Sequence, residues 1–249
     1  MKNIRIIPSL LLENKRLVKG KKFADHVDSG DPIKTCVAYE SQLADEIIII
    51  DLEAHKKKIK PNFEILKDIS SECNTPITFG GNISVEEDAI KLIQNGADKI
   101  IINSNLKKNS LVNSLSKKFG NQSIVAGVDI IREKESYRVL TNGVLSTMNP
   151  LKEIAEILSM DIGELKITFI DYEGMKKGFD FTFAKQILDS STKPIIFEGG
   201  IGTLEDINYA LEIGIDSIAL GHMITFGDNN IFKIKQFLQN KKFELRLRD

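Results

Sequence analysis

The sequence contains no tryptophan, only two cysteines and only three histidines in 249 residues. The two cysteines, Cys36 and Cys73, lie far apart and lack the spacing of metal ligands, so we expect buried thiols in a reducing compartment and no metal centre. An excess of one charge is missing as well, because the net charge is only −1. This balance gives no indication of nucleic-acid binding.

Long apolar runs are also absent. No stretch approaches the roughly 20 apolar residues that a membrane-spanning helix needs, and the N-terminus lacks the apolar segment of a signal peptide. We therefore expect a cytoplasmic protein that does not bind membranes. The chain shows neither a linker nor a low-complexity segment, so we expect one domain over residues 1–249.

The sequence does contain a regular alternation of short apolar runs and longer amphipathic segments. Runs rich in Ile, Val and Leu on both faces are typical of parallel strands covered by helices. The expected strands are Ile4–Leu12, Glu46–Leu52, Thr75–Phe79, Lys99–Asn103, Ser123–Asp129, Leu165–Ile170, Pro194–Phe197 and Ser217–Leu220. The expected helices are Pro32–Leu43, Phe63–Glu72, Val85–Asn95, Leu106–Phe119, Pro150–Met160, Phe181–Asp189, Leu204–Ile213 and Phe232–Gln239. This alternation predicts an α/β protein with a closed (β/α)8 TIM barrel.

The two halves of the chain repeat each other. When the sequence is aligned on itself at an offset of 118 residues, Pro76–Ile83 falls on Pro194–Ile201 without a gap. We therefore predict an internal half-barrel duplication, with half-barrels at about residues 1–118 and 119–249.

A duplicated chain should carry paired functional groups. The same offset places Glu46 on Glu164, as expected, but it places Leu11 on Asp129. One half thus has a carboxylate where the other half has a leucine.

Two connections after predicted strands are long. Residues 13–31 are highly charged and have Gly20 and Gly30 as candidate hinges, whereas residues 132–142 contain Ser136–Leu140, which predicts a small hairpin or flap. Loops that follow strands form the active face of such barrels. We therefore expect two lids, with tolerated surface insertions as the alternative.

Glycine-rich turns follow the third and seventh predicted strands, at Gly80–Asn82 and Gly199–Gly202, and the fourth and eighth strands end at Asn103–Ser104 and Gly221–His222. Glycine lets the backbone approach an anion closely, and helix N-termini behind such turns offer N–H donors. We predict two phosphate cradles on opposite sides of one mouth, spanned by a ligand with a phosphate at each end. Tight turns without a ligand are the alternative.

Four charged residues lie at or near the starts of predicted strands: Arg5, Glu46, Lys99 and Glu164. These starts meet at the barrel end opposite the active loops. Two cations and two anions predict a ring of ion pairs there. The residues alone leave open whether this ring is a structural plug or surrounds an axial passage. His26 and His55 lie in polar segments and are expected to be solvated.

Several short motifs together point to one family: Arg5–Pro8, Leu17–Gly20, Gly30–Pro32, Ala44–Glu46, Gly96–Lys99, Ile102–Ser104, Asp171–Gly174 and Gly199–Gly200. Through them the chain resembles the cyclase subunit of imidazole glycerol phosphate synthase over essentially its full length. The resemblance implies a partner glutaminase that docks on the bottom of the barrel. It also implies that the ammonia released there passes along the barrel axis to the top.

The resemblance also assigns residues. It implies an ammonia gate of Arg5, Glu46, Lys99 and Glu164, and a glutaminase interface near Asp98 and Gln122. The predicted ligand- and phosphate-binding set is Lys19, Asp51, Gly81, Asn103, Ser104, Thr168, Glu173, Gly174, Gly200, Gly221 and His222. No cofactor is implied.

The main departure from the family lies in Ser9–Leu12, where the family has Cys-Leu-Asp-Val. The family uses two opposed aspartates as general acid and base. One matches Asp129, and the other is Leu11. Loss of such a group typically costs about 10²–10⁴ in rate. Three further positions also differ from the usual residues: Asn82, Glu173 and His222.

This combination of an intact gate and a missing carboxylate resembles a paralogous branch found in gene sets for surface-polysaccharide and flagellin-sugar synthesis. The resemblance implies ammonia supply to a separate ATP-dependent amidotransferase, which converts an acetamido sugar to an acetamidino sugar. The first alternative is a genuine cyclase of histidine biosynthesis, with Glu13 or Asp51 replacing the lost carboxylate. The second is a sugar-phosphate isomerase of similar build. Whether the chain is itself an enzyme stays open at this point.

Overall fold

The computed structural model describes residues 4–22, 24–106, 109–241 and 243, in which eight parallel strands close into a barrel. In barrel order these strands are β1 (Arg5–Glu13), β4 (Ile47–Asp51), β5 (Ile77–Gly80), β6 (Lys99–Ile102), β7 (Ile124–Glu133), β10 (Glu164–Phe169), β11 (Ile195–Glu198) and β12 (Ser217–Leu220). The pairing of β12 with β1 closes the ring. The predicted TIM barrel is confirmed.

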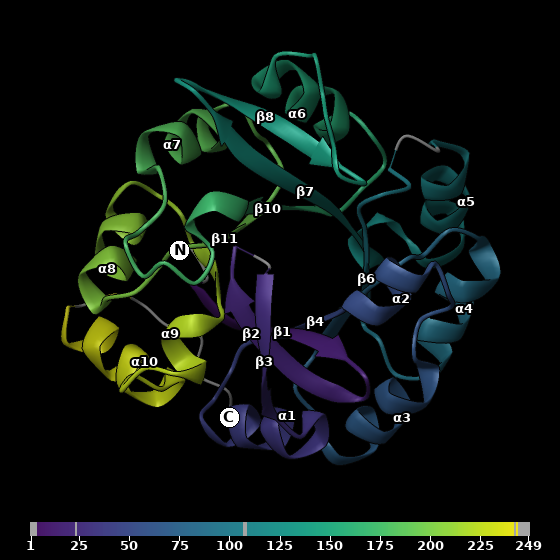
Figure 1. Ribbon diagram of the computed structural model, residues 1–249, viewed down its shortest axis with the longest axis horizontal. Coiled ribbons are helices and arrows are strands. Elements are labelled where there is room, and N and C mark those ends of the chain that lie inside the picture. The colour runs from purple at the N-terminus through teal and green to yellow at the C-terminus, as the bar shows by residue number, and fades with distance from the viewer. Residues whose placement is uncertain (1–3, 23, 107–108, 242, 244–249) are drawn as a thin grey trace.

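Helices form an outer ring around the strands (Figure 1). The helices between successive barrel strands are α1 (Pro32–Ser41), α3 (Phe63–Glu72), α4 (Glu86–Gln94), α5 (Asn109–Phe119), α6 (Pro150–Leu158), α7 (Phe181–Asp189) and α8 (Leu204–Glu212), and α10 (Ile231–Asn240) follows the last strand. Capping side chains accept hydrogen bonds from the first backbone amides of several of them: Asp31, Asn62, Asn149, Asp180, Thr203 and Asn230. Such caps fix where these helices begin.

The strands bury apolar side chains on both faces. Ile6 belongs to the larger core between strands and helices, whereas its neighbour Ile7 belongs to a smaller core inside the barrel. This division follows from the alternation of side chains along a strand. The inner core consists of Ile7, Ile48, Ile101, Val125, Ile196 and Ala219. Burial on both faces explains why the strands appear in the sequence as nearly continuous apolar runs.

The connection over residues 13–31 forms strands that the sequence did not predict. Here β2 (Arg16–Lys21) pairs with the end of β1, Leu11 opposite Val18, and β3 (Ala24–Gly30) pairs with β2. The physical reason is that β1 extends beyond the barrel rim, where its unpaired backbone groups find partners in β2. The first candidate lid is thus a hairpin continuous with the barrel sheet.

The second long connection forms the hairpin that the sequence predicted. β7 continues beyond the predicted end at Asp129 and pairs with β8 (Ser136–Thr141), which in turn pairs with β9 (Val144–Leu145). Figure 1 shows β7 and β8 side by side at one edge of the barrel.

Short helical segments complete the described chain. α2 (Leu52–Lys57) has six residues and α9 (His222–Thr225) has four, too few for a helical period to be evident in the sequence. Two 3₁₀ turns, η1 (Asn121–Ser123) and η2 (Ile170–Tyr172), flank β7 and β10. None of the helices within the described ranges is long and apolar enough to span a membrane.

Candidate functional site

The four charged residues at the strand starts form the predicted ring of ion pairs. Arg5 Nη1 lies 3.1 Å from Glu46 Oε2, and Arg5 Nη2 pairs with Glu164. Lys99 Nζ lies 2.8 Å from Glu46 Oε2 and 3.0 Å from Glu164 Oε2. Each cation therefore bridges both carboxylates. The ion pairs are confirmed, whereas the gate function of the ring stays a prediction.

The hydroxyl group of Ser217 holds the ring from one side. Ser217 Oγ accepts hydrogen bonds from Arg5 Nε and Nη2 at 3.0 and 2.9 Å. Burial alone would raise the pKa of Glu164, but the hydrogen bond and charge of Arg5, together with Lys99, leave that pKa below its ordinary value. The carboxylate of Glu164 is thus kept as an ionised partner of the ring's cations. Next to this ring along the axis lies the inner apolar core.

The opposite end of the barrel holds a cavity of about 360 Å³. Leu11 on β1 and Asp129 on β7, the first and fifth barrel strands, line it from opposite sides. Among the predicted ligand residues, four also line it: Gly81, Asn103, Ser104 and Thr168. The cavity thus lies where the sequence placed the active face.

Asp129 is held in place by an amide and a hydroxyl. Asn103 Nδ2 donates to Asp129 Oδ2 at 3.0 Å, and Thr168 bonds the same carboxyl group. Burial raises the pKa of Asp129, and the positive charge of Lys166 only partly opposes this rise. A carboxyl group with a raised pKa in a cavity is a candidate for accepting and returning a proton.

Two charged residues that sequence reasoning missed also line this cavity. Lys166 on β10 and Glu198 on β11 form a buried ion pair, and Lys166 Nζ donates to Thr168 Oγ1 at 2.7 Å. Burial alone would raise the pKa of Glu198, but Lys166 and Lys19 leave it below its ordinary value. The barrel interior therefore contains a fixed ammonium–carboxylate pair beside Asp129.

The repeat in the sequence contained a signal for this pair. At the offset of 118 residues Lys166 falls on Ile48, and Glu198 falls on Gly80. Both positions break the symmetry of the half-barrels by placing a charge opposite an uncharged interior residue. A charged residue opposite an uncharged one identified the Leu11–Asp129 position. A comparison of all interior positions between the two halves would have identified Lys166 and Glu198 in the same way.

A much smaller cavity of about 10 Å³ lies between Gly174, Gly200 and Gly221, the other predicted cradle. Lys19 occupies the adjacent space, with its Nζ 2.6 Å from Glu173 Oε1. Both side chains are almost completely buried. A Cβ atom added at Gly221 would lie 2.2 Å from Lys19 Nζ, so this ammonium group rests directly against the backbone there.

Asp51 has a local structural role. Its Oδ1 accepts from the Ala54 amide and its Oδ2 from the Asn62 amide, both at 2.9 Å. The side chain thereby caps α2 and anchors the start of α3. Neither Asp51 nor Glu13, the two carboxylates considered as substitutes for the lost aspartate, is among the residues that line the larger cavity. Glu13 instead pairs with Lys56 at 2.7 Å.

The histidines lie closer to the site than predicted. His26 and His55 both line the larger cavity, and both are half-buried on regular elements, so the expectation of solvated loop residues is wrong. His26 lies on β3, 3.3 Å from Glu13 Oε2, and His55 lies on α2. Both segments were taken for loops. His222 lines the smaller cavity, and burial together with Lys176 lowers its pKa.

The two predicted interface residues lie at the same barrel end as the ion-pair ring. Asp98 Oδ2 accepts from the Ile77 amide at 2.8 Å at the start of β6, and Gln122 Nε2 donates to the Phe119 carbonyl at 3.2 Å just before β7. Their position is compatible with a docking face, and that role stays a prediction.

The chain is similar to known proteins over nearly its whole length. The family described as "Histidine biosynthesis protein" matches residues 5–230. "Imidazole glycerol phosphate synthase subunit HisF" of Dictyoglomus turgidum is 34% identical over 247 residues, 98% of each chain. A Campylobacter jejuni protein named "Putative imidazole glycerol phosphate synthase subunit hisF2" is 34% identical over 248 residues, 99% of this chain and 100% of that protein. The HisF subunit of Sulfolobus acidocaldarius is 34% identical over 250 residues, 99% of this chain and 100% of that protein.

Proposed function

Since the chain belongs to the histidine biosynthesis protein family and is similar to HisF subunits over nearly its whole length, we propose that it receives ammonia from a partner glutaminase and conducts it through the barrel. The ammonia would serve a separate ATP-dependent amidotransferase that amidinates a surface or flagellin sugar. On this proposal the barrel does not itself carry out the cyclase reaction of imidazole glycerol phosphate synthase.

The observation that carries the proposal is the contrast between the two ends of the barrel. The ring of Arg5, Glu46, Lys99 and Glu164 is fully paired, as the gate function requires. At the other end Leu11 faces the cavity where the resemblance calls for a carboxylate. A leucine can neither accept nor donate a proton, so an acid–base reaction that needs two opposed carboxylates lacks one of them.

The barrel interior supports the choice of ammonia as cargo. Above the ring lies an apolar layer that includes Ile7, Ile101 and Val125. A neutral molecule crosses such a layer at small cost, whereas an ammonium ion loses its hydration there. The ring supplies charged partners at the entrance, and the apolar layer selects the neutral form.

The first test is turnover of the bis-phosphorylated ribulosyl substrate of the synthase with ammonium salt as the nitrogen source. We expect no measurable cyclase activity in the wild-type chain and partial activity in Leu11→Asp. A wild-type rate near that of an ordinary cyclase would refute delivery without cyclisation. A Leu11→Val variant serves as the control, because it changes the packing at this position without adding a carboxylate.

A second test addresses the gate. In a complex of the chain with its glutaminase, Lys99→Met should uncouple glutamine hydrolysis from ammonia-dependent product formation. Free ammonium salt should restore product formation to the wild-type level. Unchanged coupling in Lys99→Met would show that ammonia does not pass the ring.

A specific observation favours genuine cyclase activity as the second candidate. Glu198 lines the same cavity as Asp129, and its pKa is lowered by Lys166, so a second ionised carboxylate is present despite Leu11. The names of the relatives also support this candidate. If the wild-type chain turns over the bis-phosphorylated substrate, Glu198→Gln should reduce the rate by about 10²–10⁴.

A further inference from the structure

The two predicted phosphate cradles differ in the space that they enclose. The cavity that reaches Gly81 and Ser104 has a volume of about 360 Å³, whereas the cavity between Gly174, Gly200 and Gly221 has about 10 Å³. A single water molecule needs roughly 10–15 Å³ of such volume. A phosphate group therefore fits at the first end and not at the second.

Lys19 fills the second end, beside Gly174, Gly200 and Gly221, and Glu173 neutralises its charge. Its ammonium group lies 2.6 Å from Glu173 Oε1, and neither side chain is more than 3% exposed. Backbone contacts reinforce this closure, because the Lys22 amide donates to the Glu173 carbonyl at 3.0 Å. A phosphate that entered here would have to break a buried ion pair and lift the β2–β3 hairpin.

The charge at the second end also opposes a phosphate. Glu173 and Glu198 both line the smaller cavity. Lys19 and Lys166 pair with these two carboxylates, so neither of these ammonium groups offers an unopposed charge to an incoming dianion. In a buried setting like charges repel strongly, and a phosphate beside two carboxylates is disfavoured.

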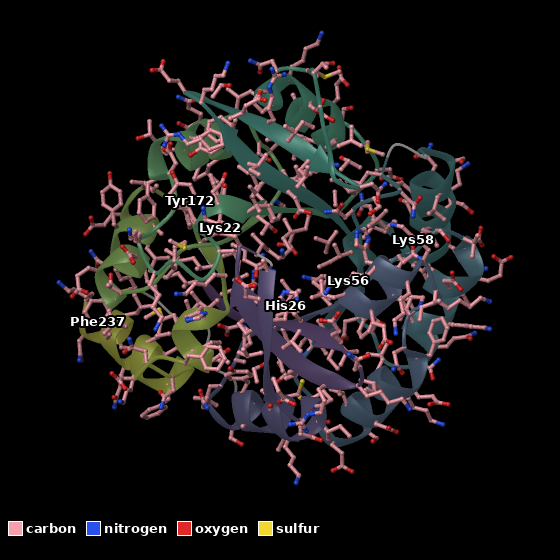
Figure 2. All side chains as sticks on the ribbon, in the orientation of Figure 1. Lys22, His26, Lys56, Lys58, Tyr172 and Phe237 are labelled. Atoms are coloured by element: carbon pink, nitrogen blue, oxygen red, sulfur yellow. The ribbon has the colours of Figure 1, made fainter. Side chains whose placement is uncertain are left out.

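The first end has the opposite character. Ser104 and Asn103 offer hydroxyl and amide donors, and Gly81 keeps the backbone accessible there. Lys22 adds positive charge to the rim, where Lys56 is paired with Glu13. In Figure 2 these two lysines lie with His26 over the open end of the barrel. Donors combined with cations are the groups that bind phosphate.

We propose that the cavity takes a ligand with a single phosphate, held at the Gly81–Ser104 end. Its other end carries hydroxyl or amino groups that face Asp129, Lys166 and Glu198. The inference deepens the proposed function and rests on it, because it names the ligand class of the same cavity. It departs from the ligand with a phosphate at each end that the glycine turns alone predicted.

Calorimetric titration with three probes tests the inference: ribose, ribose 5-phosphate and ribulose 1,5-bisphosphate, at constant ionic strength. Ribose 5-phosphate should bind at least about tenfold more tightly than ribose, the gain expected from one set of charge-assisted phosphate contacts. The bisphosphate should bind within about fivefold of the monophosphate, because its second phosphate finds no site. A bisphosphate preference above fivefold, or no effect of the first phosphate, would overturn the inference.

Variants place the phosphate in the cavity. Ser104→Asp adds a carboxylate at the first end and should weaken ribose 5-phosphate binding by about tenfold or more. Ser71→Asp on the exposed end of α3 is the matched control and should leave binding unchanged. If Ser104→Asp keeps the melting temperature of the wild type and also binds ribose 5-phosphate as tightly as the wild type, the inference is contradicted.

A double variant tests whether Glu173 and Glu198 exclude a second phosphate. Glu198→Ser removes a carboxylate that lines the smaller cavity, and Glu173→Gln releases Lys19 for an incoming anion. Combined, they should raise the ratio of bisphosphate affinity to monophosphate affinity by about tenfold. An equal gain for both probes would show that these glutamates do not select against a second phosphate. All titrations omit ammonia and glutaminase, so this inference and the ammonia-delivery function can fail separately.

Discussion

Lys19 on β2 and Glu173, just after η2, form an ion pair of 2.6 Å in which both side chains are almost fully buried. The pair ties the hairpin of the first long connection to the opposite side of the barrel mouth. An ion pair of this kind is costly to break from one side, because the remaining charge stays buried without its partner.

Glu173→Gln should therefore loosen the hairpin. We expect a destabilisation of about 3 kcal/mol and faster amide exchange over residues 16–30, since Lys19 loses its buried partner. Hydrogen-exchange mass spectrometry with thermal unfolding measures both effects. Asp28→Asn removes the exposed partner of Arg16 in the same hairpin and should have a much smaller effect, because water screens exposed ion pairs. Equal effects of the two substitutions would mean that the buried pair does not clamp the hairpin.

Stability should depend on pH through the ion-pair ring. Burial raises the pKa of Glu164, but Arg5 and Lys99 outweigh this effect and leave the folded-state pKa lowered. The contribution of Glu164 to the free energy of unfolding is therefore present above its unfolded pKa, about 4.3, and is lost as pH falls through the folded pKa. Glu164→Gln should lower the melting temperature at pH 7 by roughly 4–8 °C, for a loss of about 2 kcal/mol. This deficit should shrink below about pH 4.

Melting curves from pH 3 to pH 8 would show this trend. Glu72→Gln at an exposed position of α3 is the control and should run parallel to the wild type throughout. A Glu164→Gln deficit of the same size at pH 3 and pH 7 would contradict the role of the ion pairs.

The Lys166–Glu198 pair should behave as a coupled unit. Lys166→Met leaves Glu198 buried without its cation and is expected to cost about 3–5 kcal/mol. The double variant Lys166→Met/Glu198→Met should recover much of this loss, because no charge remains unpaired. Urea denaturation of the wild type, Lys166→Met, Glu198→Met and the double variant gives the coupling energy, which should exceed about 1 kcal/mol. Additive losses would indicate that the two side chains do not depend on each other.

Asp129 should make folding less favourable as pH rises. Burial raises its folded-state pKa above the unfolded value, so the stability it contributes is complete below that unfolded value, about 3.9, and is lost as pH rises through the folded pKa. Asparagine does not titrate. Asp129→Asn should therefore melt close to the wild type at pH 4 and above it by several degrees at pH 8. A variant that melts below the wild type at pH 8 would refute the assigned direction.

Much of the fold could be predicted because its signals are local. The strands containing Ile7 and Ile48 are buried on both faces, so they appear as continuous apolar runs, and caps such as Asn62 and Asp180 mark helix starts. The repeat itself placed Leu11 opposite Asp129, and the structure keeps both at one cavity.

The missed features depend on distant partners. The strands β2 and β3 were not predicted, because Val18 forms regular structure only through its pairing with Leu11 at the rim. His26 was assigned to solvent for the same reason, since its place beside the cavity follows from that hairpin.

The sequence by itself determined the barrel, the ring of ion pairs at its base and the loss of one carboxylate at its mouth. Each of these follows from the residue types at strand positions. Those positions can be recognised in the sequence from its regular period and its internal repeat. The tertiary structure alone decided which charges meet. Lys19 reaches Glu173, and Lys166 reaches Glu198, only after the strands close into a ring. The Lys19–Glu173 pair closes the barrel mouth beside Gly174, Gly200 and Gly221. A buried charge needs an oppositely charged partner, and only the folded chain brings these partners together.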